Sequence, residues 1–219
     1  MRKLIIFIFV FLLSVPAWAV QPKNEDQKTL YALGVDLARK ISFFYLSVEE
    51  YEYVKQGMTD VATGKKLDAE PGPYMENINQ LLRKRMQDVA NKQKELAKPY
   101  LEKAAKENGA QKMPSGLIYQ QIKAGTGSQP KASDVVKAHY TAFLIDGTEF
   151  ENSFKEGKPR ELSLAKVTAC LREGIGIMKV GGKAKLICPS DIAYGDQGIP
   201  PFIPGGAALV YEVDLLGIQ

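Results

Sequence analysis

Side chains that commonly move protons or bind metals are scarce in this chain. His139 is the only histidine, and Cys170 and Cys188 are the only cysteines. A Ser-His-Asp site or a His/Cys metal set needs several such residues together, and the two cysteines form no C-x-x-C pair of the kind used in thiol redox catalysis. We interpret His139, flanked by Ala138 and Tyr140, as a structural strand residue. The sequence therefore predicts a function without a metal, a cofactor or an acid–base histidine.

The residue types that stand out instead form an apolar, proline-rich loop near the C-terminus. Residues 198–206 carry three prolines together with Phe202 and Ile203, and Tyr194 lies in a tight turn just before them. Exposed loops are normally polar, so a stiff apolar loop is typical of the wall of a binding pocket. The alternative is an ordinary connector whose apolar side chains fold into the core.

The elements that would position this loop have the alternating pattern of β-strands. Beyond residue 113 apolar and polar residues alternate with period two, and Asp146-Gly147 is a strong hairpin motif. These patterns predict an α+β domain over residues 113–219, in which an antiparallel sheet wraps over one short helix. The expected strands are 116–122, 134–144, 148–153, 162–164, 183–188 and 208–216, and the expected helix is 171–178.

The N-terminal half has a helical pattern. Residues 20–73 contain apolar residues at spacings of three and four, and Ser47 begins a typical N-terminal capping sequence. A long linking helix is expected over residues 74–112, kinked at Pro99. Its apolar face fades after Ala90, so we expect the later turns to bridge solvent between domains. The sequence thus predicts an all-helical N-terminal region followed by a long linking helix.

Aromatic residues are unusually dense between residues 43 and 53 of the helical region. Two short helices and one long arm cannot readily bury such a cluster within a single chain. We therefore expect a homodimer in which helices of two copies share one core. The alternative is a monomeric helical bundle that packs on the C-terminal domain.

The first 19 residues predict export. Arg2 and Lys3 precede the apolar run Leu4–Leu13, and Ala17-Trp18-Ala19 is a typical cleavage site, which together indicate a secretory signal peptide. No later apolar run is long enough to span a bilayer, so no membrane span is expected in the mature chain. The net charge of +4 is small and dispersed, which argues against nucleic-acid binding. We expect a periplasmic protein.

Export changes the interpretation of the two cysteines. Cys170 and Cys188 are an even pair in an oxidising compartment. A single disulfide would tie the segment before Leu171 to the end of the 183–188 strand. The alternative is two separately buried thiols.

The motifs of the C-terminal half resemble those of FKBP-type peptidyl-prolyl cis-trans isomerases. The resemblance runs in colinear order from Leu117 to Gln219, and the leading helices resemble the dimerisation region of the Mip-like periplasmic subgroup, through Tyr31-Ala32-Leu33-Gly34. The C-terminal motifs are Ala138-His139-Tyr140-Thr141, Asp146-Gly147-x-x-Phe150, Met178-x-x-Gly181-Gly182-x-Ala184-Lys185-Leu186, Ala193-Tyr194-Gly195, Ile203-Pro204 and Leu209-Val210-Tyr211-Glu212-Val213-x-Leu215-Leu216.

This resemblance implies an aromatic-lined cleft that receives a proline ring and eases rotation about the preceding peptide bond. It implies that Tyr140, Phe150 and Tyr211 form the floor of the site and that Tyr194 donates its hydroxyl to a substrate carbonyl. It also implies substrate-binding positions at the rim and floor: Val167, Thr168, Leu171, Phe202, Ile203 and Glu151. The implied partners are proline-containing peptides and unfolded exported proteins, with no cofactor.

Several residues depart from the family pattern. Leu171 stands where the family usually has a tryptophan, Glu151 where it has an aspartate, and Arg160 and Thr168 make the rim more polar. Gly205-Gly206 replaces stiffer residues. These changes predict weaker isomerase activity than that of a member with the full aromatic set. A dimeric holdase chaperone with little isomerase activity is the alternative function, and a purely structural adaptor is a third.

Overall fold

The helix nearest the N-terminus presents its apolar face to solvent. A computed structural model of the protein describes residues 21–219, so the predicted signal peptide lies outside the described residues. The chain divides into two compact units after Ala38, and α1 (Glu25–Lys40) makes up most of the described part of the first. No residue of α1 is buried, and Leu30, Tyr31 and Leu33 are all more than half exposed. The amphipathic helix expected here is present, and its large apolar side chains are exposed.

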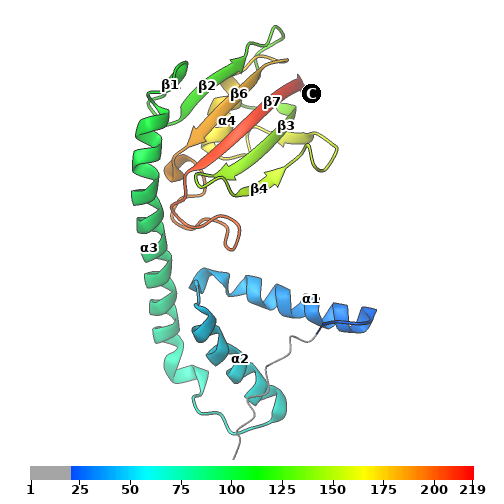
Figure 1. Ribbon diagram of the computed structural model, residues 1–219, viewed down its shortest axis with the longest axis vertical. Helices are drawn as coiled ribbons and strands as arrows, with labels where there is room; N and C mark the ends of the chain where they lie inside the picture. The colour runs from blue at the N-terminus through cyan, green and yellow to red at the C-terminus, as the bar shows by residue number, and fades with distance from the viewer. Residues whose placement is uncertain (1–20) are drawn as a thin grey trace, which may run out of the picture. The chain divides into compact units, whose positions relative to one another are not determined.

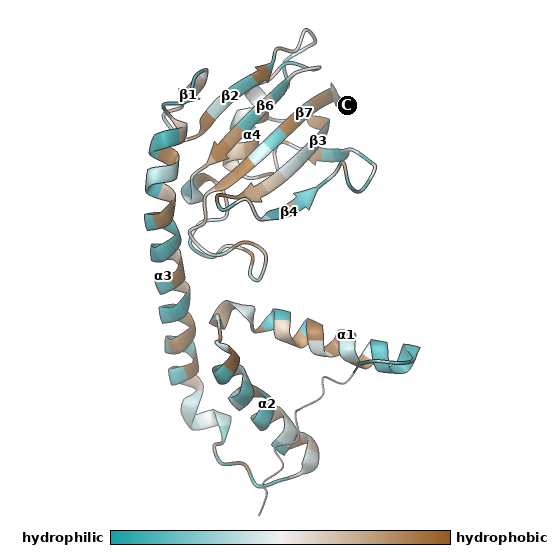
Figure 2. Cartoon of the chain, viewed as in Figure 1, coloured by the Kyte–Doolittle hydropathy of each residue, from teal (hydrophilic) through white to brown (hydrophobic). Residues whose placement is uncertain are grey.

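The second helix begins at the predicted cap. After a short 3₁₀ turn, η1 (Ser42–Phe44), the chain enters α2 (Val48–Thr63) through a capping box at Ser47. Ser47 Oγ accepts a hydrogen bond from the Glu50 amide, and Glu50 Oε2 accepts one from the Ser47 amide at 2.8 Å. That backbone hydrogen bond and an ion pair with Arg85 hold the pKa of the Glu50 carboxyl below its usual value. Apolar positions of α1 and α2 are brown in Figure 2, and on α2 the side chains of Val48 and Val61 are more than half exposed.

The long helix differs from the predicted one both in where it ends and in which residues it buries. α3 runs from Pro71 to Ala104 and continues through Pro99. It does not reach residue 112, because the chain turns at Gly109, where φ is positive, and residues 110–112 enter the sheet. The expectation that its later turns bridge solvent is wrong, because α3 buries three alanines at seven-residue intervals: Ala90, Ala97 and Ala104. Small side chains on one face let a helix lie close to a neighbouring element, which a pattern of large apolar residues would not have revealed.

The C-terminal half is an antiparallel sheet of seven strands (Figure 1). The strands pair in the order β1-β2-β6-β7-β3-β4, and β5 also pairs with β3. Each predicted strand is present, within a few residues of its expected bounds, and the predicted α+β fold is confirmed. The strands are β1 (Ala110–Lys112), β2 (Ile118–Lys123), β3 (Val135–Leu144), β4 (Glu149–Asn152), β5 (Arg160–Ser163), β6 (Lys183–Cys188) and β7 (Leu209–Ile218).

One short helix fills the concave side of this sheet. α4 (Ala169–Ile177) begins two residues before its predicted start and is capped by Thr168, whose hydroxyl accepts a hydrogen bond from the Leu171 amide. Gly174 lets α4 approach β6 closely, since a Cβ there would lie 2.5 Å from Leu186 Cδ1. Buried residues of α4 and of the strands form one hydrophobic core. The opposite face of the sheet carries a smaller core that includes Ala104 of α3.

A disulfide links the helix to the sheet. Cys170 on α4 and Cys188 at the end of β6 are bonded, and both are fully buried. The bridge is the first of the two possibilities left open by the sequence. In the sequence, Cys170 directly precedes Leu171, and Cys188 directly precedes the segment that leads through η2 (Ser190–Ile192) to Tyr194.

Candidate active site

Four aromatic residues from distant parts of the sequence meet on the inner side of the sheet. Tyr140 and Tyr211 face each other from the paired strands β3 and β7, with ring centroids 6.1 Å apart in an edge-to-face arrangement. Phe150 of β4 makes a second edge contact with Tyr211 at 6.3 Å. Tyr194, from the turn after η2, is half-buried and packs against the same core. The structure therefore brings together all four residues expected to line the site.

The two tyrosines at the base of this group are strongly desolvated. Burial raises the pKa of both Tyr140 and Tyr211 above the ordinary tyrosine value. The Tyr140 hydroxyl donates a 2.5 Å hydrogen bond to Glu151, whereas the Tyr211 hydroxyl is buried and makes no hydrogen bond of ordinary geometry within the described chain, although the Tyr194 side chain lies near enough to raise its pKa. An unpaired buried hydroxyl is costly, so its retention at this position is typical of a functional site.

The remaining predicted residues divide into two groups. Leu171 and Ile203 are buried in the core that holds the aromatic residues, and Val167 packs against it. Phe202 does not join them: it is 52% exposed, and the Arg39 guanidinium lies 5.7 Å from the centre of its ring. Thr168 is half-buried and serves as the cap of α4.

A charged network borders the aromatic group. Arg160 of β5 contacts Glu151 at 3.3 Å and Glu156 at 2.7 Å, so Glu151 is held between Arg160 and the Tyr140 hydroxyl. The sequence had predicted only that Arg160 would make the rim polar. The network instead gives Arg160 a defined partner, because β5 pairs with β3 and places Arg160 opposite Ala138. Pairing across strands could not be identified from the motif alone.

His139 and Ser153 support the strand that carries Tyr140. His139 Nδ1 lies 2.9 Å from Ser153 Oγ, and its ring stacks on Phe154 with centroids 4.5 Å apart. Ser153 is fully buried; its hydroxyl accepts a hydrogen bond from the Tyr140 amide and lies 3.1 Å from the Tyr140 carbonyl oxygen. These contacts agree with a structural role for His139.

A loop of residues 194–206 connects Tyr194 to the start of β7 and is called the 194–206 loop below. Within it, the amides of Ile199 and Ile203 each donate a hydrogen bond to the other's carbonyl, at 2.7 and 3.0 Å. The peptide bond between Pro200 and Pro201 is cis. The loop is thus internally closed, and it orients the buried side chain of Ile203 toward the core.

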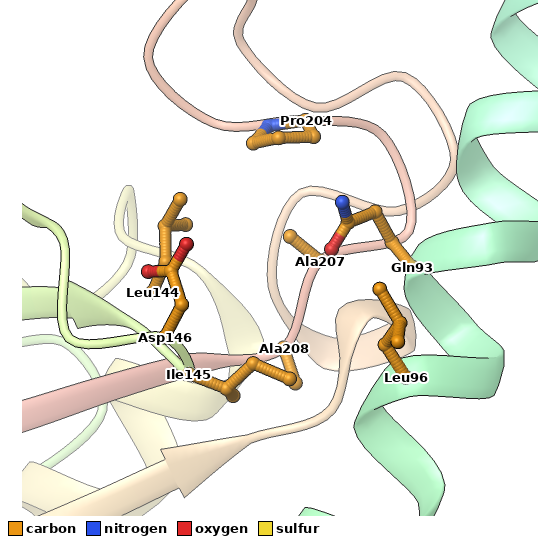
Figure 3. A pocket seen from close by; sticks show the side chains of 8 residues that line it. All are labelled: Gln93, Leu96, Leu144, Ile145, Asp146, Pro204, Ala207 and Ala208. Carbon is orange, nitrogen blue, oxygen red and sulfur yellow. The ribbon is translucent and has the colours of Figure 1, made fainter.

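A cavity of about 300 Å³ lies beside this loop (Figure 3). Gln93 and Leu96 of α3 line one side, and none of the four aromatic residues lines it. Figure 3 shows the side chains of Leu144 and Asp146 across from those two residues. Among residues 21–219, no group of three or more His, Cys, Asp or Glu side chains could hold a metal ion.

Comparison with known proteins identifies the family. A model of the FKBP-type peptidyl-prolyl cis-trans isomerase domain matches residues 126–216, and a model of the domain amino-terminal to it matches residues 26–120. The chain is 34% identical to the FKBP-type peptidyl-prolyl cis-trans isomerase FkpA of Aeromonas hydrophila, over 94% of this chain and 82% of that relative. The chain belongs to the FKBP-type peptidyl-prolyl cis-trans isomerase family. The family inferred from the motifs is therefore confirmed, and the protein is an enzyme of this class.

Two further FKBP-type proteins resemble the whole chain. The FKBP-type 22 kDa peptidyl-prolyl cis-trans isomerase of Escherichia coli is 33% identical, over 88% of this chain and 95% of that one. The crystal structure of FkpA from Escherichia coli superposes with a TM-score of 0.66 at 33% identity, covering 91% of this chain and 99% of that chain. The similarity thus includes the helices as well as the FKBP-type domain.

Proposed function

We propose that the aromatic group carries the isomerase activity and acts on peptide bonds that precede proline in unfolded exported proteins. The observation that supports this most directly is the convergence of Tyr140, Phe150, Tyr194 and Tyr211 from four separate elements. Rotation about a peptide bond is opposed by resonance, with a barrier of about 18–20 kcal/mol. A twisted amide has lost that resonance and is less polar than the planar form, so desolvated apolar walls bind it preferentially.

Each residue has a role in this proposal. Tyr140, Phe150 and Tyr211 contact the proline ring, Tyr194 donates its hydroxyl to a substrate carbonyl, and Leu171 closes the floor. Val167, Thr168, Ile203, Phe202 and Glu151 border the bound peptide. No nucleophile, metal or general acid takes part, because no covalent bond is made or broken.

A proline-containing chromogenic peptide, with a protease that cleaves only the trans isomer, tests the proposal. We expect Phe150→Ala to reduce kcat/KM at least tenfold and Tyr194→Phe to reduce it less. Ile122→Ala is a matched control, because Ile122 is 52% exposed on β2 and outside the group. Loss of activity in the control variant to the same extent, or none in Phe150→Ala, would contradict the proposal.

We further propose that the activity is lower than that of relatives with a tryptophan at the floor. Leu171 offers less ring area to the proline than an indole would, and Arg160 and Thr168 make the border more polar. Leu171→Trp should therefore raise kcat/KM on short peptides. The same changes should weaken the binding of macrolide inhibitors. A wild-type turnover equal to that of relatives with the full aromatic set would overturn this part of the proposal.

We also propose that the protein is a homodimer, which the exposed apolar residues of the helical region favour, and that it is periplasmic, as the predicted signal peptide implies. Leu30, Leu33, Val48, Tyr53 and Val61 are each more than half exposed. Such side chains, spread over both α1 and α2, need a partner surface, and a second copy of the chain offers a matching one. Cell fractionation and light scattering on the mature protein test the location and the dimer.

A second function, the binding of unfolded chains to prevent their aggregation, is favoured by the same exposed residues. One comparison distinguishes this second function from isomerisation. If Phe150→Ala abolishes isomerisation while suppression of aggregation persists, the helices carry the chaperone function; if both are lost together, they do not.

A further inference from the structure

The long helix touches the 194–206 loop backbone to backbone. Gly206 has a φ of +76°, and a Cβ at that position would lie 2.3 Å from the carbonyl oxygen of Ala90. Ala90 is fully buried on α3. No side chain separates the two segments here, so a displacement of α3 at Ala90 must displace the loop. This contact also gives a physical reason for the glycine at a position where the family has a stiffer residue.

Two polar contacts from the helical region hold the same loop. The amide of Gly205 donates a 3.2 Å hydrogen bond to the hydroxyl of Tyr45, which follows η1. Lys94, one turn after Ala90 on α3, lies 2.5 Å from Asp196 and 3.6 Å from Asp191. The hydrogen bond to Asp196 raises the pKa of the Lys94 ammonium, so the group stays charged throughout the physiological range. The loop is therefore anchored at both of its ends.

These anchors lead directly to the residues of the proposed site. The Gly206 amide donates a 2.8 Å hydrogen bond to the carbonyl of Gly195, which follows Tyr194. Asp196 comes next in the chain, and Ile203 lies between the two anchored ends. A shift of the loop at Gly205 and Gly206 would thus be transmitted to Tyr194 through one hydrogen bond, and to Ile203 through two peptide bonds.

A cavity lies beside the points at which α3 contacts the loop. The cavity of about 300 Å³ separates Gln93 and Leu96 of α3 from Pro204 and Ala207 (Figure 3). The loop therefore has open space on this side. Single substitutions at the anchoring points should therefore have a measurable effect.

We propose that α3 and Tyr45 hold the 194–206 loop in its catalytic position, which makes Ala90, Lys94 and Tyr45 positioning residues for the isomerase. The inference rests on the proposed function, in that Tyr194 and Ile203 belong to the site. The helical region then has a role in catalysis in each protomer, separate from any role in dimerisation or in binding unfolded chains.

A pair of identical substitutions on α3 tests the backbone contact in the full-length mature chain. Ala90→Leu inserts a large side chain against the loop, whereas Ala104→Leu inserts it against Ile118, Ile187 and Val210 on the outer face of the sheet. We expect Ala90→Leu to lower kcat/KM about three- to tenfold and Ala104→Leu to leave it unchanged, although both lower Tm. Equal kcat/KM in the two variants would overturn the proposal.

Surface substitutions test the ion pair without a risk to folding. Lys94→Gln should lower kcat/KM about two- to fivefold, within the range that partly exposed ion pairs produce. Because salt screens such pairs, raising the NaCl concentration should lower the activity of the wild type toward that of Lys94→Gln and leave the variant unaffected. Lys98→Gln, which removes an ion pair with Glu95 within α3 alone, is the matched control. A salt response that persists in Lys94→Gln would contradict the inference.

A charge exchange and a direct measurement of the loop complete the test. Lys94→Asp and Asp196→Lys should each lower kcat/KM, and the double variant should recover most of the loss; a double variant as weak as the single ones would count against the ion pair. Amide hydrogen exchange of residues 199–206 should accelerate in Ala90→Leu and not in Ala104→Leu. Absence of activity in the wild type would instead refute the proposed function, and the two failures are thus distinguishable.

Discussion

At the scale of single residues, two tyrosines of the site differ in the hydrogen bonding of their hydroxyl groups. The Tyr140 hydroxyl donates a hydrogen bond to Glu151, whereas the Tyr211 hydroxyl makes no hydrogen bond of ordinary geometry in the described chain, although the Tyr194 side chain lies close to it. Tyr211→Phe should therefore leave stability unchanged or raise it by up to about 1 kcal/mol, and Tyr140→Phe should lower it by about 1.5–3 kcal/mol, since it removes a hydrogen bond to a charged group. Urea unfolding measures both. A loss of stability in both variants would contradict this assignment.

The same two residues predict how stability depends on alkaline pH. Their pKa values in the folded chain are raised by burial, so the unfolded state releases these protons first, above the ordinary tyrosine pKa of about 10. The native state then binds more protons than the unfolded state, and the free energy of unfolding should fall as pH rises past about 10. The expected slope is roughly 1.4 kcal/mol per pH unit for each tyrosine, and Tyr211→Phe should make it shallower. Unfolding curves between pH 9 and 11, with equal slopes in wild type and variant, would disprove the expectation.

Arg160 provides a third prediction at this scale. Arg160→Met keeps much of the side-chain length but leaves Glu151 without its cation, so Tyr140 loses part of its positioning. We expect stability to fall by about 0.5–1 kcal/mol, since the pair is about one-third exposed, and kcat/KM to fall with it. Lys155→Met, which removes an exposed ion pair with Glu149, is the control and should not change kcat/KM. The peptide assay distinguishes the two.

At the scale of elements, the disulfide joins α4 to β6 under the aromatic group. It closes a loop with a sequence separation of 18 residues, for which restriction of the unfolded chain contributes about 3 kcal/mol. The double variant Cys170→Ala/Cys188→Ala should therefore lose about that amount in urea unfolding without reductant. Because both cysteines are fully buried, dithiothreitol alone should leave the folded wild type oxidised. Rapid reduction of the native protein, or an unchanged midpoint in the double variant, would contradict this.

The elements also show which features a sequence can predict. The strands alternate clearly, and the cap at Ser47 has an unmistakable local pattern, so both were predicted within a few residues. The burial of the later turns of α3 was missed because Ala97 and Ala104 do not stand out in a charged helix, whereas Ala90 was already part of the predicted apolar face. The close approach of the Gly206 backbone explains the small side chain at Ala90, and packing against Ile118, Ile187 and Val210 explains the one at Ala104. The opposite roles of Tyr140 and Tyr211 likewise depend on cross-strand neighbours, and no local pattern encodes them.

At the scale of the whole molecule, the unpaired apolar residues of α1 and α2 predict a dimer that a single charge disrupts. Leu33 is 55% exposed on α1, and Leu216 is 46% exposed on β7. Leu33→Glu should convert the protein to a monomer in light scattering, whereas Leu216→Glu should leave it dimeric. Short peptides should be isomerised equally well by both variants, because neither residue belongs to the aromatic group. A monomeric wild type would refute the premise.

The edge strands of the sheet determine whether an unfolded chain can pair with the protein by adding a strand. A long, open outer strand offers free amides and carbonyls to which any extended polypeptide can hydrogen-bond. Here the outermost strands are β1, with three residues, and β4 and β5, with four each, and the register between β3 and β4 is irregular. An unfolded chain therefore finds almost no template on which to add itself as another strand. It contacts side chains instead, and without strand pairing its binding is readily reversible.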